Sequence, residues 1–204
     1  MKALEIGVFA GAAVAALAGA FAAASSFLGG DDAPGAAPPQ AQTEAAPANT
    51  AQVRNSRYGF RFRYPKDWQP TRAPDPRVVE LVQRNDSVAC MVSVHEQALP
   101  SDVTGKPKNL GRLLAMSSPA QLGTASLPGA KISSFEKSTL GGQEARFFKV
   151  EVAVPGAGLG KFEVHATLRS FGAVVLLCLA PDTLARDSDV QDAFKLARTS
   201  FSFD

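Results

Sequence analysis

Alternating apolar and charged residues dominate the last third of the chain. This period of two predicts a β-hairpin, with one buried and one wet face, over Arg146–Val154 and Lys161–Arg169. The apolar positions are Phe148, Val150, Val152 and Val154 on the first strand and Phe162, Val164, Ala166 and Leu168 on the second. The glycine-rich stretch Gly156–Gly160 joins two strands and opens no helix, so we interpret it as a hairpin loop and not as a phosphate site.

Shorter patterns predict further strands. The predicted strands are Tyr58–Tyr64, Val78–Gln83, Val88–Val94, Ile132–Leu140 and a short last strand with Phe201 and Phe203. Ala173–Ala180 is apolar at every position, so both of its faces should be covered.

Two helices are expected beside these strands. Asn109 can cap a short helix with Leu110, Leu113 and Leu114 on one face. Ser188 can cap a second helix, whose apolar stripe is Val190, Ala193, Phe194 and Ala197. The predicted fold class is therefore α+β, an antiparallel β-sheet covered by helices.

The beginning of the chain differs in character from this domain. Residues 1–28 contain an uncharged run from Ile6 to Leu28, long enough to span a bilayer. Lys2 before the run and two acids after it place the N-terminus in the cytoplasm and the rest outside. The run therefore predicts a transmembrane anchor or a secretory signal.

Anchor and signal remain alternatives. Gly7, Gly11, Ala15 and Gly19 recur every four residues and would form a smooth helix-packing stripe, which favours a retained anchor. Ala20-Phe21-Ala22 and Ala22-Ala23-Ala24 fit a signal cleavage site, which favours removal. The expected location is the inner membrane with a periplasmic domain, or the soluble periplasm if the segment is cleaved.

Composition divides the remainder into a linker and one domain. Residues 29–52 are rich in Ala, Pro and Gln and have almost no apolar bulk, which predicts a disordered linker. Residues 53–204 have the size of a single domain. The formal net charge of +2 gives no broad basic field, so nucleic acid is not an expected partner.

The order of these segments is similar to a known family. The opening Tyr58-Gly59-Phe60-x-Phe62-x-Tyr64-Pro65-x-x-Trp68 resembles the start of PsbP-like domains, as do Gly141-Gly142 before a hairpin and the closing Ser200-Phe201-Ser202-Phe203. These domains are relatives of the extrinsic photosystem II protein and share a fold with the Ran-binding Mog proteins. The resemblance covers about residues 53–204. It implies an α-β-α sandwich and a non-enzymatic accessory role on a larger assembly, with no catalytic residues carried over.

Candidate chemistry in the domain is sparse. The histidines are His95 and His165, and both are predicted to lie on solvated strand faces. A metal site would need one of them to meet carboxylates such as Glu96 or Glu163. No serine lies in a nucleophile elbow. We therefore expect no enzymatic activity, no metal and no cofactor.

Basic residues crowd the first predicted strand. Arg57, Arg61, Arg63 and Lys66 form a candidate interaction surface for an acidic protein or for acidic lipid head groups. The alternative is a solvated strand face that balances charges on its neighbour.

Two further expectations concern single residues. Cys90 and Cys178 lie in apolar strands that are not sequential, so we predict two buried, unpaired thiols. Trp68 follows the first strand and should close one end of the core.

The functional hypothesis is a non-enzymatic, extracytoplasmic accessory domain that docks on a membrane protein complex. The alternative is a small-ligand carrier, or a hydrolase, with a pocket between the sheet and a helix.

Overall fold

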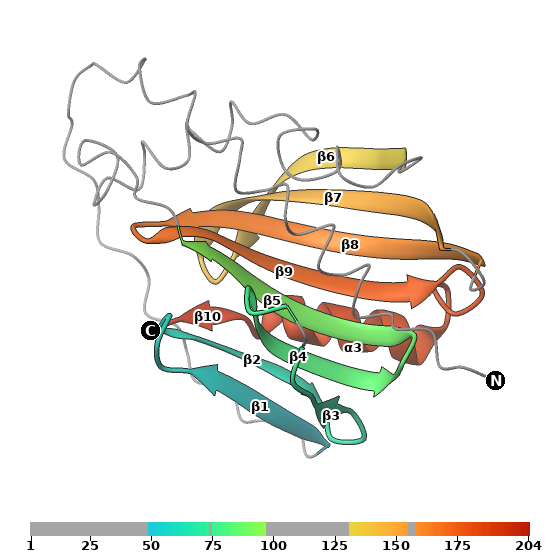
Figure 1. The fold of residues 1–204 in the computed structure, drawn as a ribbon, viewed down its shortest axis with the longest axis horizontal. Helices are drawn as coiled ribbons and strands as arrows, with labels where there is room; N and C mark the ends of the chain where they lie inside the picture. Colours follow the sequence, from blue (N-terminus) through green and yellow to red (C-terminus); the bar gives the residue numbers. More distant parts are fainter. Residues whose placement is uncertain (1–48, 74, 97–130, 155–157) are drawn as a thin grey trace.

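Two antiparallel sheets and one helix make up the described part of the chain. The computed structural model describes residues 49–73, 75–96, 131–154 and 158–204. The small sheet has the order β1-β2-β10 and the large sheet has the order β3-β4-β5-β9-β8-β7-β6 (Figure 1). The elements are β1 (Thr50–Asn55), β2 (Phe60–Pro65), β3 (Gln69–Pro70), β4 (Val78–Asn85), β5 (Val88–Glu96), β6 (Lys131–Leu140), β7 (Gln143–Val154), β8 (Gly158–Arg169), β9 (Gly172–Pro181), α3 (Ser188–Thr199) and β10 (Ser202–Phe203).

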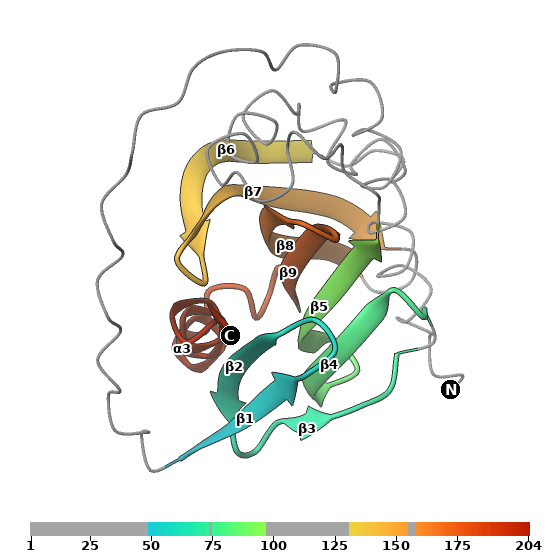
Figure 2. The ribbon, with the colours of Figure 1, turned by 90° about the vertical axis from the view of Figure 1, so that its left-hand side faces the viewer.

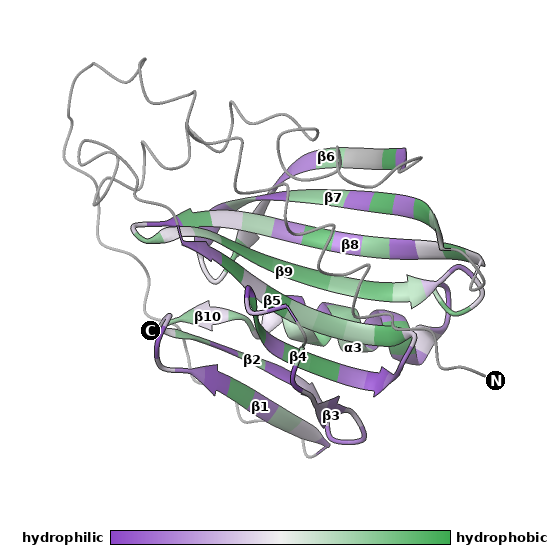
Figure 3. Cartoon of the chain, viewed as in Figure 1, coloured by the Kyte–Doolittle hydropathy of each residue, from purple (hydrophilic) through white to green (hydrophobic). Residues whose placement is uncertain are grey.

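The predicted hairpin is confirmed as β7 and β8. Phe148 lies opposite Val164 and Val150 opposite Phe162, and all four are buried. Figure 3 shows the alternation of apolar and polar positions along both strands. On the opposite face of the hairpin, oppositely charged residues lie across from each other: Lys149 lies opposite Glu163, and Glu151 lies opposite Lys161.

The strand β9 lies at the centre of the large sheet, between β5 and β8. Its residues from Gly172 to Ala180 are all buried, as expected for a strand covered on both faces. One face contributes Val175 and Leu177 to a core shared with β7 and β8. The other contributes Val174 and Leu176 to a second core, under the small sheet and α3.

The small sheet and α3 cover the same face of the large sheet, as Figure 2 shows. Phe60 and Phe62 point inward from β2, and both stack on Phe201, with ring centroids 5.4 and 6.2 Å apart. The buried stripe of α3 is the predicted one, Val190, Ala193, Phe194 and Ala197. The N-cap is Asp187 and not Ser188, because the Asp187 carboxylate accepts from the amides of Asp189 and Val190.

Some predictions lie outside the described residues, and one boundary is corrected. The segment at residues 1–28 and the helix expected after Asn109 lie outside the described residues. Within the described residues, α3 covers one face of the large sheet. In the described residues no helix is long and apolar enough to cross a membrane. The strand β1 begins at Thr50, so residues 50–52 of the predicted linker lie in a strand paired with β2.

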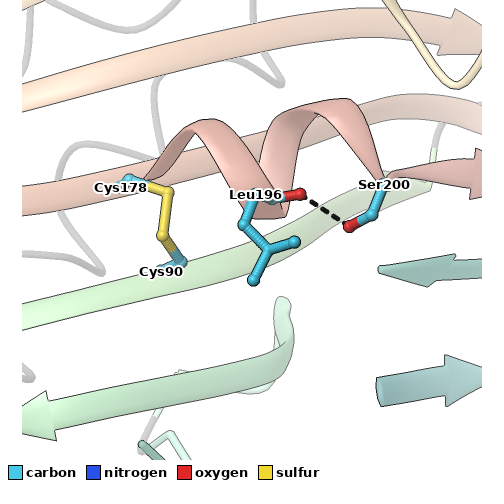
Figure 4. Close-up of a disulfide and its surroundings, with 4 residues drawn as sticks. All are labelled: Cys90, Cys178, Leu196 and Ser200. Atoms are coloured by element: carbon cyan, nitrogen blue, oxygen red, sulfur yellow. Dashed lines mark hydrogen bonds between the residues drawn. A yellow bond between two sulfur atoms is a disulfide. The ribbon is translucent and has the colours of Figure 1, made fainter. Parts of the chain in front are cut away.

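The prediction of two free thiols was wrong. Cys90 and Cys178 form a disulfide, with Cα atoms 4.1 Å apart, that joins β5 to β9 beside α3 (Figure 4). The two strands are far apart in sequence, but β9 pairs directly with β5 and the register sets the cysteines opposite each other. Burial was predicted correctly, since the two cysteines are 1% and 3% exposed.

We expect the disulfide to contribute substantially to stability. Its sequence separation of 88 residues closes a long loop in the unfolded chain, which gives about 4 to 5 kcal/mol in the chain-entropy treatment. Denaturant unfolding of the full-length protein, with and without reductant, measures this contribution. A Cys90→Ala/Cys178→Ala variant is the control, because reductant should leave its midpoint unchanged. An unchanged wild-type midpoint in reductant would contradict the cross-link.

Trp68→Ala should destabilise the domain by about 3 to 5 kcal/mol, the usual range for a large buried aromatic. The side chain is 4% exposed and belongs to the core under the small sheet. Thermal or urea unfolding of the full-length variant gives the difference. A loss below about 1 kcal/mol would show that the indole is not packed as described.

Candidate functional site

The outer face of the small sheet carries three arginines. Arg54 lies opposite Arg61 in the β1–β2 pairing, and Arg63 follows Arg61 on the same face of β2. Their neighbours in sequence point inward, since Val53, Phe62 and Tyr64 are buried. We call Arg54, Arg61 and Arg63 the arginine face. It results directly from the period-two pattern of β1 and β2.

The arginine face is only partly neutralised by the chain itself. Arg54 forms an ion pair of 3.2 Å with Asp204. Arg61 donates from Nε to the hydroxyl of Ser202 at 2.9 Å, a neutral partner, and its side chain is exposed. Arg63 is half-buried. The positive charge of β2 is therefore directed at solvent.

The predicted basic residues do not form one surface. Arg61 and Arg63 lie on the arginine face, and Lys66 is exposed just after β2. Arg57 lies in the β1–β2 turn, where its guanidinium binds Glu96 at 2.8 Å and stacks over the Tyr58 ring. Arg57 thus belongs to a separate cluster at the end of β5.

That cluster fastens the β1–β2 turn to the large sheet. The Tyr58 hydroxyl donates to Glu96 at 2.8 Å, and the Tyr58 ring packs on Phe171 with centroids 5.5 Å apart. The hydrogen bond from Tyr58 and then the charge of Arg57 hold the pKa of Glu96 below its ordinary value. Burial and the contact with Glu96 raise the pKa of Tyr58. Arg57, Tyr58 and Glu96 bind one another, so we assign this cluster a structural role.

The prediction of solvated histidines was wrong for both residues. His95 is 4% exposed, and among the described residues neither of its ring nitrogens has a hydrogen-bond partner. Burial lowers its pKa to about 4, and the nearby charge of Arg77 adds to the effect. Ser93, two residues earlier on the same strand face, has a buried hydroxyl that likewise finds no hydrogen-bond partner in the described part of the chain. Both faces of β5 are covered, which the sequence of this strand did not reveal.

His165 is buried on the other side of the large sheet. It is 3% exposed, stacks on Phe147 at 4.7 Å, and has Nδ1 3.3 Å from the Ser138 hydroxyl. Burial lowers its pKa to about 4, so the imidazole is neutral at pH 7. His95 pairs with Ala173 and His165 pairs with Leu176; these two residues lie three positions apart on β9, so they point to opposite faces of the sheet. The two histidines therefore cannot share a site.

Ser138 and His165 are the one serine–histidine pair that the described residues bring together. A nucleophile of this type needs a base that is itself oriented by a third group. No carboxylate in the described part of the chain bonds to His165, and no three metal-ligating side chains converge there. The pair is a packing contact with a hydrogen bond.

A groove opens between β7, β8 and α3. Its volume is about 400 Å³, within the range of small-molecule sites. The lining includes the side chains Lys149, Glu151, Lys161, Glu163, Arg186, Gln191 and Phe194. Lys149, Glu151, Lys161 and Glu163 belong to the wet face of the predicted hairpin, and Arg186 lies just before α3. The sequence could not show that α3 lies beside these strands. The groove is thus a site that sequence reasoning missed.

Comparison with known proteins places the fold. No family model matches the chain, and no curated protein matches it. Among solved structures, cyanobacterial PsbP (CyanoP) from Synechocystis sp. PCC 6803 is similar, with 17% identity, a TM-score of 0.51, and coverage of 81% of this chain and 98% of that one. The fold is PsbP-like. The predicted resemblance to PsbP-like domains is thereby confirmed at the level of the fold.

A second similar structure is that of a protein from Bacteroides thetaiotaomicron VPI-5482. It has 12% identity and a TM-score of 0.50, over 75% of this chain and 48% of that one. At these identities the likeness establishes the PsbP-like fold alone. Function has to be argued from the surfaces of this chain.

The buried histidines predict a loss of stability in acid. The folded state favours the neutral imidazole of each histidine. Each histidine therefore contributes fully to the free energy of unfolding above its ordinary pKa of 6.5, and this contribution is lost as the pH falls towards about 4. A shift of this size corresponds to at most about 3 kcal/mol per histidine. Urea unfolding at pH 7 and pH 4.5 measures it.

His95→Leu isolates one contribution from that of the carboxylates. This variant should lose less free energy of unfolding on acidification than the wild type, because it has no imidazole to protonate at that position. Equal losses in the two proteins would show that His95 is accessible to protons in the folded state.

Proposed function

We propose that this chain is an exported, non-enzymatic accessory domain that docks on a membrane protein complex. The observation that carries the proposal is the Cys90–Cys178 disulfide. Disulfides form and persist mainly in oxidising compartments such as the periplasm. A buried disulfide between two central strands is part of the folded core, which supports folding outside the cytoplasm.

The N-terminal sequence supports the same location. Residues 1–28 have the length and the flanking charges of an anchor or a signal, and residues 29–52 have the composition of a tether. The strand β1 begins at Thr50, and it is an edge strand of the small sheet. A retained anchor would therefore lead directly into the sheet that carries the arginine face.

The absence of an enzymatic role is supported by the arrangement of reactive side chains. His95 and His165 lie on opposite faces of the large sheet, and no carboxylate from the described ranges joins the contact between Ser138 and His165. An accessory role needs a docking surface and no catalytic group. The arginine face meets that requirement.

The partner surface is proposed to be acidic protein. Arg61 and Arg63 are alternate residues of a regular strand, so their Cα atoms lie about 7 Å apart on one face of the small sheet. Arginine pairs with carboxylates in a bidentate manner, and it is enriched in interfaces for that reason. Two arginines side by side on one strand favour a protein surface with matching acids over a fluid lipid head-group layer.

The test is purification of the tagged full-length protein from membranes in mild detergent. The wild type should co-purify with a defined protein, and an Arg61→Glu/Arg63→Glu variant should lose it. An Arg84→Glu/Lys137→Glu variant is the matched control, because both residues are exposed cations of the large sheet. Retention by both variants, or loss by both, would contradict docking through the arginine face.

The alternative of a ligand carrier also has an observation in its favour. The groove between β7, β8 and α3 is a pocket between sheet and helix, as that hypothesis required. A ligand there would be compatible with an accessory role, because the groove and the arginine face have no residue in common.

A further inference from the structure

In the described part of the chain each sheet ends in two edge strands, and three of these edges are protected against further pairing. The edge strands β3 and β10 have two residues each, and β3 includes Pro70. The edge strand β6 is longer but irregular, since its register with β7 shifts between Ile132 and Ser134. Short strands, prolines and bulges are common ways in which proteins prevent another strand from adding to a sheet.

The strand β1 is the edge without such protection. Its six residues, Thr50–Asn55, contain no proline and pair with β2 without a register shift. It lies along the lower border of the molecule in Figure 1, and no described strand pairs with its outer side. A regular strand at an open edge can pair with one more strand.

The register shows which backbone groups face the open edge. The Lys66 amide donates to the Asn49 carbonyl at 3.1 Å, so Asn49 and the β1 residues of the same parity bond to β2. Gln52 and Arg54 have the other parity, so their N–H and C=O groups point away from β2. Both residues are exposed. Each therefore offers a backbone donor and a backbone acceptor, and the two sets lie about 7 Å apart.

The charge beside this edge indicates what can occupy it. A strand added to β1 places alternate side chains on the solvent face of the small sheet, beside Arg54 and in line with Arg61. The ion pair of Arg54 with Asp204 is exposed and uses one guanidinium nitrogen, so Arg54 keeps donors for a second carboxylate. Acidic residues at alternate positions of the added strand therefore match the arginine face.

A second copy of this chain matches the edge less well. Two β1 strands paired about a two-fold axis would bring both arginine faces to the same side of one continuous sheet. The arginines of the two copies would then face like charges across the new pairing, which destabilises a sheet. The charge thus favours a different, acidic chain.

We propose that the outer edge of β1 binds an extended acidic segment of the partner protein as a fourth, antiparallel strand of the small sheet. Backbone hydrogen bonds to Gln52 and Arg54 hold the segment, and its acidic side chains lie against the arginine face. Its other side chains face the same way as Ala51, which is partly buried against the core. This inference rests on the proposed docking through the arginine face and specifies how the partner is held.

Residue-resolved hydrogen exchange of the full-length protein in detergent tests the backbone pairing. The probe is a capped peptide of about six residues, the length of β1, in which glutamate and valine alternate. At saturating peptide the amides of Gln52 and Arg54 should exchange about 10-fold more slowly or less, because they become hydrogen-bonded.

Two peptides of the same length are the matched controls. One carries N-methyl groups on the backbone amides of its glutamates, which would face β1, and the other has lysine in place of glutamate. Both should leave the exchange of Gln52 and Arg54 unchanged. Equal protection by the methylated peptide would refute strand addition, and equal protection by the lysine peptide would refute an acidic occupant. No protection by the glutamate peptide up to about 10 mM would overturn the proposal.

Variants in the membrane purification separate this inference from the proposed function. Gln52→Pro removes an outward N–H group and should lose the co-purifying protein, whereas Gln52→Ala keeps the backbone and should retain it. The Gln52→Pro variant should melt close to the wild type, because the lost N–H group does not bond to β2. Its retention of the partner, together with loss by Arg61→Glu/Arg63→Glu, would refute strand addition and leave the arginine-face docking intact. Retention by both variants would contradict both.

Discussion

The pairing of β9 with β5 and β8 is the constraint on which the rest of this structure depends. The strand is apolar on both faces, so it is stable only in the middle of a sheet with a covering layer on each side. It pairs with β5, although 75 residues lie between Glu96 at the end of β5 and Gly172 at the start of β9. Both cores and the disulfide follow from this placement.

The two faces of β9 then acquire different surroundings. On one face the side chains of β5, β7 and β8 form a core of their own. On the other, α3 and the small sheet add Phe60, Phe194 and Phe201. Because α3 lies on the face that carries the charged residues of β7 and β8, a groove forms between these charges and the helix. Because the small sheet packs through its aromatic face, its arginines are left in solvent. Both candidate surfaces are consequences of how β9 is covered.

Sequence predicted what depends on neighbours in the chain. The period of two predicted the β7–β8 hairpin and its buried apolar positions, and the period of 3.6 predicted the buried stripe of α3. The opening segment from Tyr58 to Trp68, Gly141-Gly142 and the closing segment from Ser200 to Phe203 together predicted the PsbP-like fold. These features are local, or they depend on one turn.

Sequence failed where partners distant in the chain decide the outcome. The cysteines were expected to remain apart because their strands are not sequential, whereas the sheet order sets β5 beside β9. The histidines were expected in solvent because each occupies the less apolar parity of its strand. However, β5 is buried on both faces from Val88 to His95, and the polar face of β8 is half-exposed at Lys161 and Glu163 but buried at His165. The edge strand β1 has a mixed polar sequence, Thr50–Asn55, and is a strand because β2 pairs with it. The groove exists only through the position of α3.

Hydrogen exchange of the full-length protein, read strand by strand, tests the central position of β9 most directly. Central strands open only with the whole domain, whereas edge strands open locally. We predict that the amides of β9, and of β5 and β8 beside it, are the slowest to exchange, and that those of β1 and β6 at the sheet edges are much faster. Exchange of β9 as fast as that of the edge strands would contradict the account.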